Sequence, residues 1–172
     1  MLIEKDNLTI RNAESGDAPQ LGLWWRDGIV MAHAGFPNGL SITDDEIRRD
    51  IAAGTDDSGR VLIIEVNNIP IGEMNYRNEG NSTAEIGIKI CDITMQGKGY
   101  GTRFLRMLIC DLFENCGYEK IILDTNLSNV HAQHTYEKLG FVRVRERYDC
   151  WVDQLGNQQS AVDYELLKST HS

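Results

Sequence analysis

The chain has 172 residues and a mass of 19.4 kDa, with 41% hydrophobic and 25% charged residues. These values suit one folded domain and exclude a disordered or collagen-like chain. No run of about 18 apolar residues is present, so the sequence predicts no membrane span. The net charge of −9 and the pI near 4.9 argue against nucleic acid as a partner, because a polyanion needs a basic surface.

The start of the chain lacks the basic and apolar regions of a signal peptide, so we expect a cytoplasmic protein. In that compartment the four cysteines, Cys91, Cys110, Cys116 and Cys150, are expected to be reduced thiols that are mostly buried. Residues 1–60 carry 11 acidic and 6 basic residues, which is −5 of the total charge. An acidic field favours cationic ligands, although solubility alone explains the same balance.

The first quarter of the chain predicts a short strand followed by two helices. Residues 8–11 alternate between apolar and polar side chains, as in a half-buried strand. Asp17, just before Ala18 and Pro19, is a candidate N-cap for a first helix. After a looser stretch over 28–41, residues 43–46 open a second helix whose first turn is acidic, as the helix dipole prefers.

The middle of the chain predicts three strands joined by short polar turns. They cover 61–66, 71–77 and 84–90, and the short turns favour an antiparallel meander. In the last of these strands the side chains alternate cleanly, so Glu85 shares a face with Lys89 and points away from the isoleucine layer.

The second half of the chain alternates between helical and strand patterns. We expect a helix over 99–116, a strand over 120–125, a helix from Asn129 to Gly140, and strands over 141–147 and 162–167, with a long hairpin loop through Trp151 and 153–160. The complete order describes a mixed α/β sheet in a single domain.

The turn Gln96-Gly97-Lys98-Gly99-Tyr100-Gly101 follows a predicted strand and opens a long helix. Glycines let the backbone approach an anion closely, and the free N–H groups of a helix start bind phosphate. The turn is not a P-loop, because its lysine is in the wrong place, and the antiparallel strands before it argue against a dinucleotide-binding βαβ unit. The pattern therefore indicates a phosphate-binding turn of another kind.

Two motifs resemble those of the GNAT superfamily of N-acetyltransferases. Gln96-x-x-Gly99-x-Gly101 resembles the pyrophosphate-binding motif Q/R-x-x-G-x-G/A of that superfamily. Asn129-x-x-Ala132-x-x-x-Tyr136-Glu137-Lys138-Leu139-Gly140-Phe141 resembles its downstream signature. The motifs stand in the order found in the superfamily, separated by one helix and one strand, and the resemblance covers nearly all of residues 8–168, which we expect to form one N-acetyltransferase domain.

The resemblance implies an α/β fold with a mixed, mostly antiparallel sheet, flanked by helices and splayed at two central parallel strands, 84–90 and 120–125. It also implies that acetyl-CoA binds in this gap and that no metal takes part. Two histidines, His131 and His134, supply too few ligands for a metal site. The implied cofactor contacts are the backbone at Ile88 and Ile90, the N–H groups of Gln96, Gly97, Lys98, Gly99, Tyr100, Gly101 and Thr102, and the side chains of Asn129 and Tyr136.

Acetyl transfer to an amine needs a base that removes a proton from the attacking amine and an acid that protonates the departing thiolate. The resemblance places Tyr136 near the thioester sulfur, as the acid. Glu85 is the preferred base, and Glu73 on the adjoining strand is its rival. The structural alternatives are a core aromatic ring for Tyr136 and an ion-paired carboxylate for Glu85. Direct attack needs no cysteine, so Cys91 is given no catalytic role.

We therefore expect an acetyl-CoA-dependent N-acetyltransferase that acts on a primary amine of a small molecule or a protein N-terminus. Residues 28–41, one of Trp24 and Trp25, and the acidic run 44–46 are candidates for the acceptor side. No nucleic acid or membrane partner is expected, and a homodimer is compatible with the sequence. The alternatives are a non-catalytic acyl-CoA-binding module and an enzyme acting on aminoacyl-tRNA, which the acidic balance disfavours.

Overall fold

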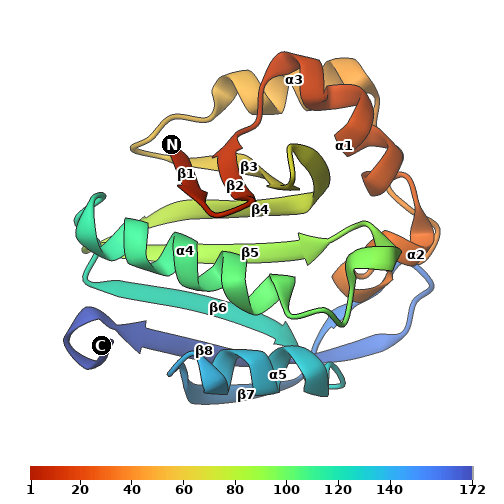
Figure 1. The fold of residues 1–172 in the computed structure, drawn as a ribbon. Coiled ribbons are helices and arrows are strands. Elements are labelled where there is room, and N and C mark those ends of the chain that lie inside the picture. The colour runs from red at the N-terminus through yellow and green to blue at the C-terminus, as the bar shows by residue number, and fades with distance from the viewer. Residues whose placement is uncertain (172) are drawn as a thin grey trace.

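The structure, a computed structural model, describes residues 1–171 and contains an eight-stranded sheet with helices on both faces (Figure 1). The strand order is β1-β2-β3-β4-β5-β6-β8-β7, and every neighbouring pair is antiparallel except β5 with β6. The strands are β1 (Leu2–Lys5), β2 (Leu8–Asn12), β3 (Gly59–Val66), β4 (Ile69–Gly80), β5 (Thr83–Ile90), β6 (Lys120–Asn126), β7 (Val142–Val152) and β8 (Gln158–Leu167). The predicted mixed sheet with a central parallel pair is confirmed.

Five α-helices accompany the sheet, and four of them stand in the order that the sequence patterns predict. They are α1 (Ala18–Trp25), α2 (Gly28–Met31), α3 (Asp44–Ala53), α4 (Tyr100–Glu114) and α5 (Val130–Lys138). The short α2 lies inside the stretch 28–41 that was expected to be looser. Within residues 1–171, no helix has both the length and the apolar character needed to cross a bilayer.

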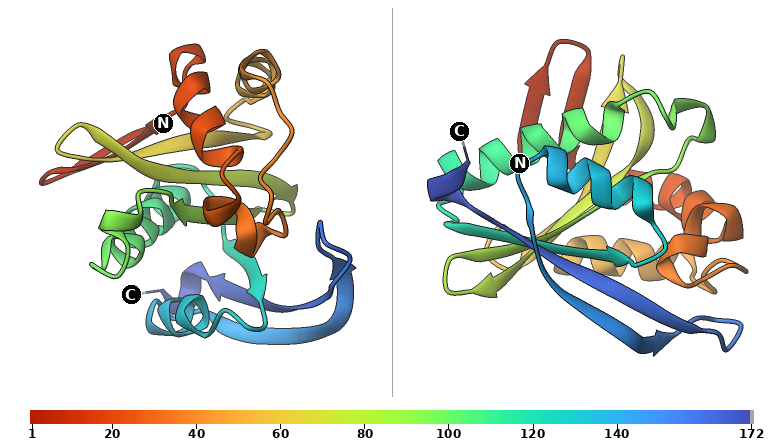
Figure 2. Two further views of the ribbon diagram at one scale, coloured as in Figure 1. Left: turned by 90° about the vertical axis from the view of Figure 1, so that its right-hand side faces the viewer. Right: turned by 90° about the horizontal axis from the view of Figure 1, so that it is seen from below.

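The two faces of the sheet bury separate hydrophobic clusters, because strand side chains alternate between them. Leu62 and Ile64 belong to the large cluster that packs against α4 and α5. Ile63, between them, belongs to the smaller cluster under α1 and α3. Figure 2 shows α4 and α5 on the opposite side of the sheet from α1 and α3. The sheet therefore separates an α4/α5 face from an α1/α3 face.

The acidic opening of α3 confirms the predicted start of the second helix. Thr43 accepts a hydrogen bond from Glu46 N, and Glu46 bonds back to the Thr43 N–H, so the two residues form a capping box. Asp17 differs from the expectation. It stands at the N-cap of α1, but its carboxylate binds Arg11 at 2.8 Å instead of the helix N–H groups.

The β7–β8 hairpin is longer than the sequence patterns indicated. Both strands continue past the expected ends, and they pair as far as Val152 with Gln158. The expected long loop over 153–160 is wrong, because only a short turn at 153–157 connects the strands. Figure 2 shows this hairpin curving away from the sheet toward α2. The ends of the two strands were not predicted, because their residues are polar where one face of the hairpin is open to solvent.

Three of the four cysteines are exposed, contrary to the expectation that they are mostly buried. Cys110, Cys116 and Cys150 lie at the surface, and Cys91 is buried. Two of the exposed thiols lie on or just beyond α4, and the third lies on the edge strand β7. Their positions follow helix and strand periodicity, which outweighs the general preference of cysteine for the interior.

Candidate functional site

The parallel strands β5 and β6 pair over a short distance and then separate. Their register contains three pairs, from Thr83 with Lys120 to Glu85 with Ile122. Beyond Glu85, residues 86–90 of β5 pair with β4 on one side and have no strand partner on the other among the described residues. The result is a V-shaped gap in the middle of the sheet, with Glu85 at its closed end.

The glycine-rich turn lies beyond the open end of this gap, at the start of α4. Gly97 and Gly99 have φ values of 71° and 80°, a region that favours glycine. A Cβ atom built on either glycine would meet no protein atom within 4 Å. The first backbone bond of the helix runs from Arg103 N to Gly99 O, and the N–H groups of residues 97–102 have no acceptor within residues 1–171. This cradle of free donors fits a pyrophosphate.

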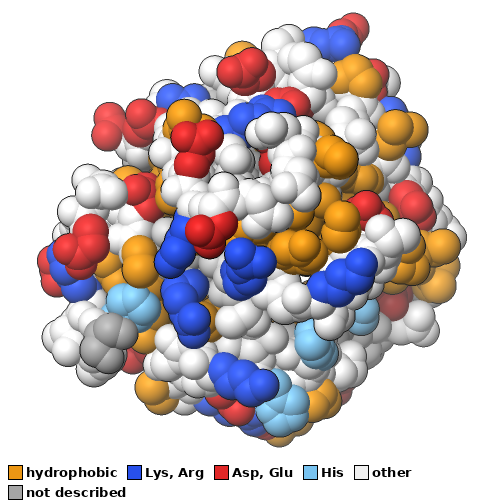
Figure 3. Space-filling view, in the orientation of Figure 1, with side chains coloured by type: hydrophobic (Ala, Val, Ile, Leu, Met, Phe, Trp, Pro, Cys, Tyr) orange, Lys and Arg blue, Asp and Glu red, His pale blue; other side chains and the backbone are white. Residues whose placement is uncertain are grey.

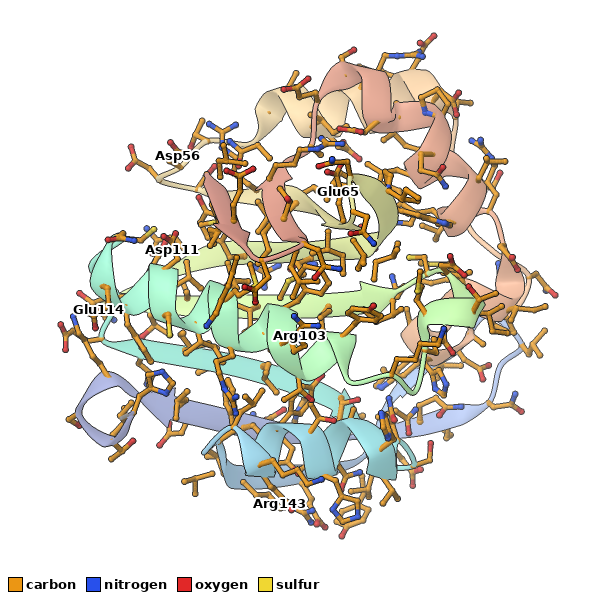
Figure 4. The ribbon with its side chains drawn as sticks, viewed as in Figure 1. Asp56, Glu65, Arg103, Asp111, Glu114 and Arg143 are labelled. Atoms are coloured by element: carbon orange, nitrogen blue, oxygen red, sulfur yellow. The ribbon has the colours of Figure 1, made fainter. Side chains whose placement is uncertain are left out.

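Basic side chains surround the start of α4. Lys98 is exposed beside the turn, and Arg103 lies over the Tyr100 ring at 5.8 Å from its centroid. Figure 3 shows Lys and Arg side chains across the face of the molecule on which α4 lies, and Figure 4 labels Arg103 on this helix. Although the whole chain is acidic, the surface around the turn is suited to an anion.

The backbone N–H of Gln96 is already hydrogen-bonded, unlike those of residues 97–102. Its N–H donates to Ile93 O at 3.3 Å, and its side-chain amide donates to Ile90 O at 2.8 Å. The side chain therefore ties the turn to the end of β5. The glutamine of the motif has a structural task here, which its position in the sequence did not reveal.

Asn129 and Tyr136 belong to α5, on the other side of the gap. Asn129 is the N-cap of the helix, where its side-chain oxygen accepts a hydrogen bond from Ala132 N at 3.2 Å. Its side-chain NH₂ group is not used in this cap. The ring of Tyr136 is buried and packs edge-on against Tyr164, with the centroids 5.7 Å apart.

The Tyr136 hydroxyl forms no hydrogen bond with any other residue in 1–171. Burial raises the pKa of this group to about 12, and the carboxylate of Asp124 on β6 contributes to the rise. The hydroxyl consequently keeps its proton throughout the neutral range. It is a proton donor without a partner among the described residues, on a largely buried side chain and near Asp124 of β6.

Glu85 lies among other carboxylates on the α1/α3 face. Its side chain is 32% exposed and is paired with Arg77. Burial raises the pKa of the Glu85 carboxyl, and Arg77 counteracts the rise in part. Further increases come from the carboxylates of Glu79, Asp124 and Asp163. Glu85 is therefore a stronger base than an ordinary surface carboxylate.

A cavity of about 270 Å³ opens beside Glu85, between β5, β6 and the β7–β8 hairpin. Its wall includes Asp124 and Asp163, with the guanidinium of Arg147 2.9 Å and 2.7 Å from their respective carboxylates. Sequence reasoning missed these three residues. The available signals were Asp124, a charge directly after three apolar residues of the predicted strand, and the alternation of apolar and acidic residues around Asp163 in β8.

Glu73, the rival base, has a different environment. It is buried, with 6% of its surface exposed, and it accepts hydrogen bonds from Trp25 Nε1 at 2.8 Å and Lys89 Nζ at 3.0 Å. Trp25 thus connects α1 to the sheet, while its neighbour Trp24 is buried in the core as one of the two was expected to be. Cys91 lies in the same region, and burial raises its thiol pKa to about 12, so it remains a neutral thiol.

The Glu73 contacts predict a stability effect. Glu73→Gln keeps an acceptor for Trp25 but leaves the Lys89 ammonium without its counter-charge. The loss of one partner of a partly buried ion pair costs about 1–3 kcal/mol. Urea denaturation should show this decrease in the free energy of unfolding. The control is Glu79→Gln, at a more exposed carboxylate paired with Arg77, where a change below about 0.5 kcal/mol is expected. Equal losses in the two variants would contradict the anchoring role of Glu73.

The acidic residues near α3 are also held by local partners. Asp44 pairs with Arg26 at 2.9 Å, and Asp45 pairs with Arg48 at 2.6 Å. In Figure 1, α3 lies at the top of the molecule, away from the β5–β6 gap. These carboxylates act in helix and loop structure, which corresponds to the simpler of their two interpretations.

Comparison with known proteins agrees with this architecture. The family model described as "Acetyltransferase (GNAT) domain" matches residues 7–142. The chain therefore belongs to the GNAT acetyltransferase family. Within residues 1–171, no group of three or more His, Cys, Asp or Glu side chains is arranged to hold a metal ion.

Solved structures share the fold over nearly the whole chain. Spermidine N-acetyltransferase from Vibrio cholerae, in complex with CoA and spermine, has a TM-score of 0.85 at 23% identity, covering 96% of this chain and 98% of that one. RimL, a ribosomal L7/L12 alpha-N-protein acetyltransferase in complex with CoA, has a TM-score of 0.82 at 15% identity, covering 97% and 98%. The yncA protein from Salmonella typhimurium, with acetyl-CoA, has a TM-score of 0.78 at 21% identity, covering 97% of both chains.

Proposed function

We propose that this protein transfers the acetyl group of acetyl-CoA directly to the primary amine of a small cationic acceptor. The observation that carries the proposal is the divergence of β5 and β6, which has free backbone donors beyond one end and the Glu85 carboxylate at the other. The family membership supports acetyl transfer, and similar proteins are described with CoA, acetyl-CoA and spermine. Acetyl-CoA, when bound, supplies the activated acyl group.

Each residue around the gap has a distinct task in this proposal. The N–H groups of 97–102 bind the pyrophosphate, the backbone at Ile88 and Ile90 binds the pantetheine arm, and Asn129 offers its NH₂ group to the same arm. Glu85 accepts a proton from the acceptor ammonium, because only a neutral amine has the lone pair needed for attack. Tyr136 holds a proton at Oη and donates it to the departing thiolate.

The acidic cavity favours a small cation over a protein N-terminus as the acceptor. Four carboxylates line the cavity, those of Glu85, Asp124, Asp163 and Glu165, against one cationic side chain in the lining, Arg147. The pKa of Glu85 is raised in part by neighbouring carboxylates. A second ammonium on the acceptor would be stabilised beside these groups. RimL, which is described as acting on a ribosomal protein N-terminus, makes such an acceptor the competing choice.

The test is a panel of primary amines with acetyl-CoA, followed by the release of free thiol. Unbranched diamines and triamines should be the best acceptors, and Glu85→Gln should lower kcat by about 100-fold, the scale of general base catalysis. The acidic limb of the wild-type kcat profile should lie above the ordinary Glu range near 4.3, because the pKa of Glu85 is raised.

The rival base provides the decisive comparison. Glu73→Gln should retain kcat within about threefold if its role is to anchor Trp25 and Lys89. A loss of kcat in Glu73→Gln with normal kcat in Glu85→Gln would reverse the assignment of the base. Binding of acetyl-CoA without turnover of any amine would instead favour a non-catalytic acyl-CoA-binding module.

A further inference from the structure

Asn75 on β4 stands opposite Gly87 on β5, on the α1/α3 face of the sheet. The amide of Asn75 lies over the glycine, since a Cβ atom added to Gly87 would be 2.9 Å from Asn75 Nδ2 and 3.2 Å from Oδ1. The φ of Gly87 is not positive, so its backbone conformation does not itself require glycine. Glycine inside a strand often marks a place where another group approaches closely, and here that group is the Asn75 amide.

Asn75 and Gly87 lie between two ion pairs that link the same two strands. Glu85 and Lys89 of β5 are each paired with the side chain opposite them on β4. The Cα atoms of these two residues are about 13 Å apart in a strand, and the glycine between them adds no side chain on this face. Diagonal neighbours across a strand pair are about 7–8 Å apart, so the Asn75 amide and the Glu85 carboxylate can both contact one small group.

The side-chain amide of Asn75 is exposed and forms no hydrogen bond with another residue in 1–171. Asn78, further along the same strand, is exposed as well, but its NH₂ group donates to Asp57 O and its oxygen accepts from Gly80 N, both at 2.9 Å. Asn75 also stands opposite the part of β5, residues 86–90, that borders the gap. Its hydrogen-bonding capacity is therefore available to a ligand at the gap.

The hydrogens on the acceptor nitrogen have different fates in acetyl transfer. A primary ammonium carries three of them. One goes to Glu85 and leaves the lone pair that attacks the thioester carbonyl. The second leaves as the C–N bond forms, which balances the proton that Tyr136 gives to the sulfur when the C–S bond breaks, and the third remains on the amide product. A secondary ammonium has only two hydrogens, and its amide product keeps neither.

We propose that Asn75 is a specificity-determining residue whose Oδ1 atom accepts a hydrogen bond from the N–H that the acceptor keeps in the amide product. This inference rests on the proposed function and deepens it, because it explains how primary amines are preferred to secondary ones. A secondary amine places a carbon substituent against the Asn75 amide and leaves Oδ1 without a partner. Since Asn75 is exposed, we expect a discrimination of about tenfold, the scale of one neutral hydrogen bond.

The first test measures binding, so that it does not depend on turnover. The probes are N-acetyl-1,4-diaminobutane and N-acetyl-N-methyl-1,4-diaminobutane, which carry the same charge and differ in the amide hydrogen. Calorimetry on the CoA complex should show that the wild type binds the first probe about tenfold more tightly. In Asn75→Ala the two affinities should agree within about twofold. Asn75→Asp keeps an oxygen acceptor at the same place and should retain the wild-type preference.

Two further variants control this experiment. Gly87→Ala moves the same amide without removing it, because the new Cβ atom would be 2.9 Å from Nδ2, so the ratio of affinities should fall as in Asn75→Ala. Asn78→Ala removes an exposed asparagine of the same strand whose amide is bonded elsewhere, and the wild-type ratio is expected. A wild type that binds the two amides equally, or an unchanged ratio in Asn75→Ala, would overturn the proposal.

Kinetics separate this inference from the proposed function. With acetyl-CoA and the release of free thiol as the signal, kcat/KM of the wild type should be about tenfold higher for 1,4-diaminobutane than for N,N′-dimethyl-1,4-diaminobutane, and Asn75→Ala should remove most of this difference. Equal kcat/KM for the two diamines in the wild type would overturn the role of Asn75 and leave the proposed function in place. Discrimination between the two amides in binding, with no turnover of either diamine, would refute the proposed function and leave Asn75 as a binding residue.

Discussion

Replacing Tyr136 with phenylalanine is expected to lower kcat by roughly 10- to 1000-fold, the scale of general acid catalysis, with little change in the affinity for acetyl-CoA. The pKa of the hydroxyl is raised to about 12 and the group has no partner within residues 1–171, so its proton is available to a leaving thiolate at neutral pH. Steady-state kinetics with a good amine acceptor, together with calorimetry for acetyl-CoA, would measure the two effects separately.

Tyr118→Phe is the matched control for this substitution. Tyr118 is buried to almost the same extent, with 7% of its surface exposed against 8% for Tyr136, and burial raises the pKa of its hydroxyl too. It belongs to the loop before β6 and is placed in no part of the proposed reaction. If both variants kept the wild-type kcat, Tyr136 would be a core aromatic residue and no more.

Gly99→Val should abolish measurable binding of acetyl-CoA, a loss of at least about 100-fold or 2.7 kcal/mol. The residue stands at φ 80° in the turn before α4, where a β-branched side chain is strained and would project into the space over the free N–H groups. Calorimetry should show the loss of affinity while circular dichroism shows the native secondary structure.

The same helix provides a control for the strain. Gly117, just beyond the other end of α4, has φ 77° and also has no atom within 4 Å of a built Cβ. Gly117→Val should therefore lower the free energy of unfolding by a similar amount, about 1–3 kcal/mol, without weakening the binding of acetyl-CoA. Equal affinities in Gly99→Val and the wild type would reject the turn as the pyrophosphate site.

Local patterns in the sequence predicted most of the elements because each left a periodic or terminal signal. The alternation over 84–90 placed Glu85 and Lys89 on one face, and Lys89 indeed pairs with Glu73 across the strands. The helix that was predicted to begin at Asn129 does so, with the Asn129 side chain as its N-cap. Strand β1 was not predicted, since four residues at the start of the chain are too few for a period to emerge.

The parts of the site that could not be predicted depend on pairing between segments that are far apart in the sequence. Nothing near Glu85 indicates that Asp163, in the last strand, will lie beside it, because that proximity arises from the strand order β5-β6-β8. Gln154 likewise looked like an ordinary loop residue, and its partners at 35–39 are more than a hundred positions away. Periodicity describes one segment at a time, whereas these sites are formed by topology.

The separation of β5 and β6 gives the sheet two inner edges in addition to the outer ones at β1 and β7. Unpaired edges can pair with foreign strands, so proteins normally cover them. A bound pantetheine arm, extended between the two inner edges, would cover both of them and would expose them again when the cofactor dissociates. By mass action, a ligand at 100 times its Kd adds about 2.7 kcal/mol to the stability of the folded state. Bound CoA would therefore cover the inner edges and stabilise the folded state at the same time.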